Sequence, residues 1–359
     1  MSLQQNPAAL DAIAFAEKVL ALLDQGAFTS TYKFAVLLGL MDLVVEQADV
    51  SGQLATMITT RQLAEKIIEV YWAHTLAYSP LSGVPKQNTR GQAEIVSRIG
   101  RFRDQSNYST LFKAKRQSEK GFKSLIDNVE KKLIEMPLPR LQYFGQKEQR
   151  FIYDFAWDKS IADNLKSVTA YQRQQDSDFD NRIHLAPQVA DYLVALNGLL
   201  RPLIQRTWAL QVAKINQLEE SKLEAFLFNN KRAAIAQFSE GLSDIQNNQC
   251  FYCEKALGIS QKTKPEVDHF VPWSRYPNNG LANLVVAHSS CNRNKGDHIA
   301  AFDHYQNWQD RNCNQVVVNT IEKMAVEFQW DVRLVESLNI ASTLYGRLED
   351  GVELWARVQ

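Results

Sequence analysis

Apolar residues recur at helical spacing over most of the first 240 residues. Residues 7–25 are rich in Ala and Leu and are followed by Gly26, which predicts a helix with a glycine stop. The next helix, over 31–45, is apolar around almost its whole circumference, and a helix of that kind is buried. The polar run Thr59–Gln62 opens a third helix that extends to about Ala77. These patterns predict a mostly α-helical protein.

The pattern changes after this third helix. The elements predicted there are a loop rich in Pro, Gly and Ser at 79–92, basic helices over 93–135, a β-hairpin of 141–144 with 151–155, and helices over 187–217 and 223–245. Pro202 lies inside the 187–217 segment and is expected to kink it or split it in two. Helical spacing returns late in the chain, at 302–308 and 315–329.

A chain of 359 residues is long enough for two or three domains. We expect a helical domain over 1–240 that recognises a substrate or a partner, with a sub-boundary near 79–92. A small module rich in potential metal ligands follows over 241–310. Residues 311–359 would form a helical C-terminal extension.

The formal net charge is zero, but the charge is unevenly spread. Residues 85–150 contain 15 Lys and Arg against 7 Asp and Glu, a local excess of eight positive charges. Such a stretch can follow the phosphates of a nucleic acid, and it can equally be a solvated helical face.

The sequence indicates a cytoplasmic protein with no membrane partner. The N-terminus lacks the basic start and apolar core of a secretory signal. The longest apolar stretch, 34–45, is interrupted by Asp42 and is too short to span a bilayer. Four cysteines in a chain of this length do not make a disulfide framework, and clustering of three of them favours a reducing compartment.

Those three cysteines have the spacing of a zinc site. Two residue pairs, each with a two-residue gap, supply four nitrogen and sulfur ligands: Cys250 with Cys253, and His288 with Cys291. Four such ligands form the closed tetrahedral set of a structural Zn²⁺ site. In a module of this size the ion would contribute to folding itself. His288 is the least secure ligand, because His298 or a water could take the fourth position. Cys313 is left over as an idle thiol.

A second set of polar residues is interleaved with the cysteines. It consists of the run Glu266-Val267-Asp268-His269-Phe270-Val271-Pro272, then Asn283-Leu284, then Cys291-Asn292-Arg293-Asn294-Lys295. In the order and spacing of these motifs, residues 247–299 resemble the HNH (ββα-metal) endonuclease family, and within it the zinc-stapled members of the bacterial restriction and defence type.

The resemblance implies a fold and a role for each motif residue. Strands at 266–269 and 283–287 would precede a short helix that carries Asn292. His269 would be the general base, since an imidazole titrates close to neutral pH. Asp268 and Asn292 offer oxygen ligands that suit a catalytic Mg²⁺ or Mn²⁺. Asn283 would fix the catalytic loop or orient the base. Three basic residues are expected to contact phosphates or to be solvated charges: Arg275, Arg293 and Lys295.

The implied function is metal-dependent hydrolysis of phosphodiester bonds in DNA, most simply double-stranded DNA, in restriction or phage defence. One such site cuts one strand, so a double-strand cut requires a homodimer or two events. Two alternatives stay open. A non-catalytic, zinc-stapled nucleic-acid-binding module would share the four zinc ligands but has no use for Asp268, His269 and Asn292 together. An HNH nuclease that cuts RNA, or that acts inside a larger defence complex, would use the same chemistry.

Overall fold

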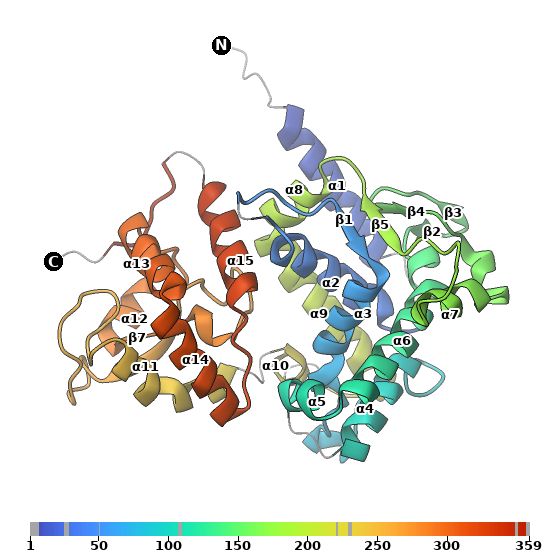
Figure 1. Cartoon of the computed structure of the whole chain (residues 1–359). Helices are drawn as coiled ribbons and strands as arrows, with labels where there is room; N and C mark the ends of the chain where they lie inside the picture. Colours follow the sequence, from blue (N-terminus) through green and yellow to red (C-terminus); the bar gives the residue numbers. More distant parts are fainter. Residues whose placement is uncertain are drawn as a thin grey trace, which may run out of the picture. The chain divides into compact units, whose positions relative to one another are not determined.

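The computed structural model describes residues 7–24, 29–49, 51–106, 110–219, 222–228, 232–348 and 351–356. The chain divides into two compact units: unit 1 is Met1–Val45 with Leu54–Asn229, and unit 2 is Glu46–Gln53 with Asn230–Gln359. Helices dominate the described residues, which confirms the prediction of a mostly α-helical protein (Figure 1). Within the described residues, no helix is long and apolar enough to cross a bilayer.

The helical part of unit 1 follows the predicted pattern closely at its start. Its helices are α1 (Pro7–Asp24), α2 (Tyr32–Glu46), α3 (Thr60–Trp72), α4 (Glu94–Ser106), α5 (Leu111–Gln117), α6 (Glu119–Glu135), α7 (Lys166–Gln172), α8 (Val189–Ala195), α9 (Asn197–Asn216) and α10 (Leu223–Phe228). Every residue of α2 except Lys33 and Asp42 is buried, as its all-round apolar surface predicts. Thr59 caps α3: its Oγ1 accepts a hydrogen bond from the Gln62 backbone N–H (3.1 Å), and Gln62 Oε1 accepts one from the Thr59 N–H (2.8 Å).

The predicted hairpin of 141–144 with 151–155 is wrong in its pairing. β2 (Tyr143–Phe144) pairs with β3 (Lys147–Glu148), whereas β4 (Tyr153–Phe155) pairs with β5 (Arg182–Leu185), and β5 also pairs with β1 (Met57–Thr59). The physical reason is the side chain of Gln142. Its Oε1 accepts from the backbone N–H groups of residues 151–153 at 2.6–3.2 Å, and its Nε2 donates to the carbonyl of Tyr153 (2.8 Å). These bonds occupy backbone groups that a longer hairpin would use.

Two helix predictions also need correction. The 187–217 segment is divided at Leu196, and α9 then runs through Pro202 without a break. Pro202 and Gly198 are both exposed, so the Gly198 carbonyl, which loses its helical N–H partner, can bond to water. The expected single helix over 223–245 is instead α10, a 3₁₀ segment (Arg232–Phe238) and α11 (Ser239–Ile245), while residues 229–231 lie outside the described part.

Unit 2 is built around an antiparallel pair of strands, β6 (Pro265–His269) and β7 (Leu284–His288), followed directly by helix α12 (Ser289–Lys295). Helices α13 (Phe302–Cys313), α14 (Gln315–Phe328) and α15 (Leu334–Gly346) complete it. All five residues of β7 are buried, so both faces of this strand are covered. The register sets Val267 opposite Val286 and Asp268 opposite Val285.

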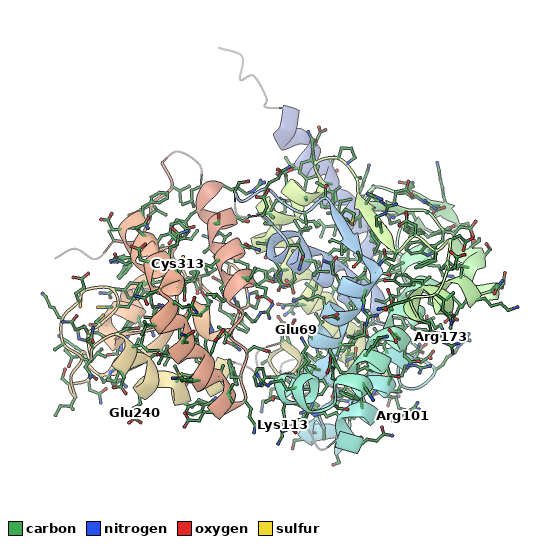
Figure 2. The ribbon with its side chains drawn as sticks, viewed as in Figure 1. Glu69, Arg101, Lys113, Arg173, Glu240 and Cys313 are labelled. Atoms are coloured by element: carbon green, nitrogen blue, oxygen red, sulfur yellow. The ribbon has the colours of Figure 1, made fainter. Side chains whose placement is uncertain are left out.

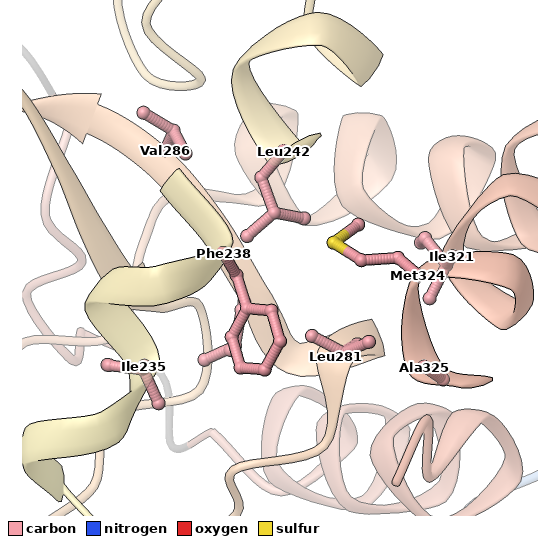
Figure 3. Packing of buried hydrophobic residues seen from close by; sticks show 9 residues of the cluster. Ile235, Phe238, Leu242, Leu281, Val286, Ile321, Met324 and Ala325 are labelled. Carbon is pink, nitrogen blue, oxygen red and sulfur yellow. The ribbon is translucent and has the colours of Figure 1, made fainter. Parts of the chain in front are cut away.

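One face of this strand pair lies on the apolar core of unit 2 (Figure 3). Val267 packs against that core, whose buried members come from the 3₁₀ segment, α11, β7 with the turn before it, and α14: Ile235, Phe238, Leu242, Leu281, Leu284, Val286, Ile321, Met324 and Ala325. Because side chains alternate along a strand, Glu266 and Asp268 leave β6 on the opposite face. Packing of one face therefore fixes where the acidic residues point.

The short segment Glu46–Gln53 belongs to unit 2 although it is distant in sequence. The Glu46 carboxylate is buried and accepts hydrogen bonds from the Tyr276 hydroxyl and the Arg333 guanidinium. The backbone carbonyl of Glu46 accepts a further bond from Asn339 Nδ2 (3.0 Å). Glu46 thus anchors the loop that follows β6.

Candidate active site and metal centre

Three cysteines and one histidine converge at one end of the β6–β7 pair. The ligand atoms of Cys250, Cys253, His288 and Cys291 all lie within 4.8 Å of one another. Cys253 Sγ is 3.3 Å from His288 Nδ1 and 3.9 Å from Cys291 Sγ. Tetrahedral ligands of one Zn²⁺ lie roughly 3.5–3.8 Å apart, given metal–ligand bonds of about 2.0–2.3 Å. The cluster therefore has the donor set and the spacing to hold a metal ion such as zinc.

The imidazole of His288 is oriented for ligation through Nδ1. Its Nε2 lies 2.9 Å from the carbonyl oxygen of Ala256, which can only accept a hydrogen bond. Nε2 therefore carries the proton, and the lone pair of the neutral ring is on Nδ1, which faces the sulfur atoms. The backbone N–H of His288 also donates to Cys250 Sγ (3.2 Å).

Backbone hydrogen bonds attach the first cysteine pair to the strands. The Cys250 N–H donates to Lys255 (2.9 Å), and the Glu254 N–H donates back to Cys250 (2.8 Å), which closes a tight turn. Next to it, the Phe251 N–H donates to the carbonyl of Val286 in β7 (2.9 Å). The residues between the two cysteines are therefore held against the strand pair. The fourth cysteine, Cys313, is at the end of α13 (Figure 2). It is exposed and is not part of the cluster.

A second polar group lies between β6 and α12. Asn292 Nδ2 is 3.3 Å from Glu266 Oε2, and Lys295 Nζ is 3.0 Å from Asp268 Oδ2. Residues two apart on a strand share a face, and residues three apart share one face of a helix. The two contacts therefore show that this face of α12 covers the acidic face of β6, and that Asp268 and Asn292 belong to one surface.

Asp268 is held through one of its two oxygens. Tyr252 donates its hydroxyl to Oδ2 (2.6 Å), and the fully buried Lys295 ammonium contacts the same oxygen. Burial and the adjacent Asp268 carboxylate raise the pKa of Tyr252 well above its usual range, so the phenol stays protonated and donates. Among the described residues, no donor reaches Asp268 Oδ1.

His269 ends β6 and contacts the loop that follows it. Its Nε2 is 2.8 Å from Asn279 Oδ1, and its ring centroid is 5.3 Å from that of Trp273. Since an amide oxygen only accepts, this contact requires the proton on Nε2. Lys295 links His269 to Asp268, because its Nζ also donates to the His269 carbonyl (2.9 Å).

Asn283 fixes the shape of the same loop. Its Oδ1 accepts from the Val271 N–H (2.9 Å), and its Nδ2 donates to the carbonyls of Val271 (3.2 Å) and Asn278 (3.0 Å). The side chain is fully buried. Asn283 thus ties both ends of the loop together, while Asn279 is the residue that contacts the imidazole.

Comparison with known families gives two matches. Residues 250–301, which contain the cysteine cluster, Asp268, His269 and Asn292, match the HNH endonuclease family. Residues 12–227 match a family described as a domain of unknown function (DUF8808), and this match covers more than half of the chain. The chain belongs to the DUF8808 family. No curated protein matches the chain.

The three basic residues expected to contact phosphates differ in burial within this DUF8808 protein. Arg275 and Arg293 are exposed, so a phosphate contact for each stays a prediction. Lys295, for which we also expected a phosphate contact or a solvated charge, is fully buried instead. Its ammonium is enclosed by Asp268, the His269 carbonyl and the Tyr252 ring, whose centroid is 5.8 Å from Nζ.

The sequence analysis assigned no role to three residues of this site: Tyr252, Glu266 and Asn279. Tyr252 lies between two cysteines, and its position there gives no sign of the carboxylate that it contacts. Glu266 lies two residues before Asp268, so strand alternation could have placed both on one face. No comparable pattern distinguishes Asn279 from its neighbour Asn278.

Replacement of Lys295 by methionine should destabilise unit 2 by about 2–4 kcal/mol, because removal of one member of a buried ion pair leaves the other charge without compensation. The estimate lies below the usual range for fully buried pairs, since Asp268 keeps the Tyr252 hydroxyl. Denaturant unfolding would measure the loss. Lys264→Met is the matched control, because Lys264 forms a half-exposed pair with Glu266 at 3.6 Å and should change stability by less than about 0.5 kcal/mol. Equal effects of both changes would contradict the buried role of Lys295.

Proposed function

We propose that the protein is a metal-dependent endonuclease that hydrolyses phosphodiester bonds in DNA. The observation that carries the proposal is the shared surface of β6 and α12, which brings Asp268 and Asn292 together within the region that matches the HNH endonuclease family. His269 is the next residue of β6 after Asp268, and its backbone carbonyl accepts a hydrogen bond from the same Lys295 ammonium. In the terms of that family, β6, β7 and α12 would be its ββα-metal core. A non-catalytic binding module would not require this combination of residues.

The donor set fits a hard divalent cation. The Asn292 amide directs Nδ2 to Glu266, and within the described part of the chain its Oδ1 has no donor. Asp268 likewise has Oδ1 available, so the two residues offer one carboxylate and one amide oxygen, which are ligands that Mg²⁺ and Mn²⁺ accept. When bound, the cation would stabilise the negative charge that develops on the phosphate. The cysteine cluster would hold a structural Zn²⁺ and staple the module.

His269 supplies the proton acceptor. The imidazole would take a proton from the attacking water, and Asn279 would hold the ring through Nε2. The loop tied together by Asn283 keeps Asn279 in place. On the surface of the same unit, exposed Arg275 and Arg293 would contact the DNA backbone.

The wider role is part of the same proposal. The helical part over residues 1–240 would recognise the substrate or a partner, and a single site of this kind would nick one strand, so that a homodimer would be needed for a double-strand cut. A restriction or phage-defence role is supported by the resemblance of residues 247–299 to defence nucleases. Cleavage of modified and unmodified DNA by the purified chain, together with phage plating on cells that express it, would test that role; equal plating on expressing and non-expressing cells would contradict it.

Plasmid nicking tests the proposed activity. The purified chain with Mg²⁺ or Mn²⁺ should convert supercoiled plasmid to the open circular form, and Asp268→Asn should lower the nicking rate by at least ~100-fold, because a metal ion contributes several kcal/mol to such a step. The asparagine keeps the shape of the side chain while it removes the charge.

Asp310→Asn provides the matched control, since Asp310 is an exposed carboxylate on α13 in the same unit. This variant should nick at the rate of the unaltered chain. DNA binding without nicking under all metal conditions would overturn the proposal and favour the non-catalytic module. Preferential cleavage of RNA would replace DNA as the substrate.

A further inference from the structure

We infer that Tyr252 is a positioning residue that connects the cysteine cluster to the proposed catalytic carboxylate, Asp268. Through this connection, the metal ion in the cysteine cluster would influence the affinity of the active site for its divalent cation. This inference rests on the proposed function. Tyr252 lies between Cys250 and Cys253 in sequence, yet its hydroxyl donates to Asp268 in β6 at 2.6 Å. No residue other than Tyr252 spans the two sites in this way among the described contacts of Asp268.

Aromatic side chains pack around the phenol ring of Tyr252 and restrict its movement. The ring makes edge-on contacts with Phe251, His304 and Trp355, at centroid separations of 5.2, 5.4 and 5.0 Å. Only 4% of Tyr252 is exposed. With the ring enclosed in this way, the place of the hydroxyl follows from the place of the turn between the two cysteines.

The turn itself depends on the cluster. Its backbone is bonded to β7 through the Phe251 N–H, and both flanking cysteines direct their sulfur atoms toward His288 and Cys291. An ion held by these four ligands would draw the cysteines together and fix the turn. Loss of the ion would leave three thiols and an imidazole with little mutual attraction, and the turn would loosen.

The contacts of Asp268 explain how a movement of Tyr252 would affect cation binding. Tyr252 and Lys295 both contact Oδ2, so the carboxylate is held by one oxygen, and neither contact uses Oδ1. A hydroxyl and an ammonium on one oxygen select a single carboxylate orientation. Partners of this kind, which orient a metal ligand from behind, change metal affinity or activity by roughly 10–100-fold when they are removed.

Tyr252→Phe separates this role from a structural one. In the full chain, the variant should keep its zinc and melt close to the unaltered protein, whereas the Kd for Mn²⁺, measured by the EPR signal of free Mn²⁺, should rise about tenfold. Nicking should fall at low Mn²⁺ and recover at saturating Mn²⁺. Tyr345→Phe is the matched control: it removes another buried tyrosine hydroxyl of unit 2, which donates to the Ala300 carbonyl (2.8 Å), and should leave the Mn²⁺ affinity unchanged.

The outcomes distinguish the inference from the proposed function. Weaker Mn²⁺ binding by Tyr252→Phe in a chain that never nicks DNA would support the inference and remove the nuclease assignment. Normal Mn²⁺ binding by a variant of an active nuclease would overturn the inference alone. Loss of zinc from Tyr252→Phe would also overturn the inference, because the hydroxyl would then be needed to keep the cysteine cluster folded. An unaltered chain that binds no Mn²⁺ would overturn both.

Discussion

Cys250→Ser should release the metal of the cysteine cluster and unfold the part of unit 2 that depends on it. A serine oxygen replaces a buried sulfur ligand, and structural zinc contributes on the order of 10 kcal/mol in small peptides at neutral pH. Unit 2 also has the apolar core on the other face of the strand pair, so we expect only part of that amount to be lost, about 4 kcal/mol. In a unit of this size, such a loss lowers the melting temperature by roughly 10 °C or more.

Zinc content and a thermal melt would measure this effect. Cys313→Ser makes the same chemical change at an exposed cysteine of the same unit that lies outside the cluster, and it should alter neither quantity. A Cys250→Ser protein that retains a full equivalent of zinc and melts normally would remove Cys250 from the metal site. Retention of zinc by a His288→Ala variant would show that the fourth ligand is not His288.

The second large effect is expected from replacing His269, the proposed general base. His269→Ala should lower the nicking rate by about 10²–10⁴-fold, the usual contribution of a positioned general base. Zinc content and Mn²⁺ affinity should be preserved, since the imidazole belongs neither to the cysteine cluster nor to the proposed cation ligands, Asp268 and Asn292. Single-turnover nicking at saturating Mn²⁺ would isolate the chemical step.

His184→Ala controls for the loss of a histidine at an exposed strand position of unit 1 and should nick normally. A His269→Ala chain that cuts at the unaltered rate would exclude His269 as the base. Asn279→Ala offers a graded comparison, because the imidazole would remain while its tautomer and orientation were released; its rate should lie between those of the other two proteins.

The sequence was informative about the site wherever spacing carries geometry. Two-residue gaps bring pairs of ligands to one ion, and the structure does bring Cys250, Cys253, His288 and Cys291 together. Alternation along β6 and helical spacing on α12 likewise determine which residues can face one another. Spacing and alternation do not predict which residue a side chain contacts. The burial of Lys295 depends on Tyr252 and β6 closing over it, and no local pattern distinguishes it from its exposed neighbour Arg293.

Local patterns were less informative about strands in unit 1. The four-residue strand β5 pairs with β4 and with the distant β1, so its existence depends on contacts far away in sequence. Gln142 shows the same limit, because its side chain takes the place of a strand partner, and glutamine has no special tendency to do so. Helices were easier to predict, since their hydrogen bonds are local, as the Thr59 cap and the buried α2 show.

The carboxylate of Glu46 limits how unit 2 can be moved between proteins. A fragment cut out at a single point near residue 230 would lack the buried acceptor that the Tyr276 hydroxyl and the Arg333 guanidinium share. A transfer of unit 2 to another protein, by engineering or by gene fusion, therefore requires both of its segments, Glu46–Gln53 and Asn230–Gln359. A single fusion point would carry over only one of them.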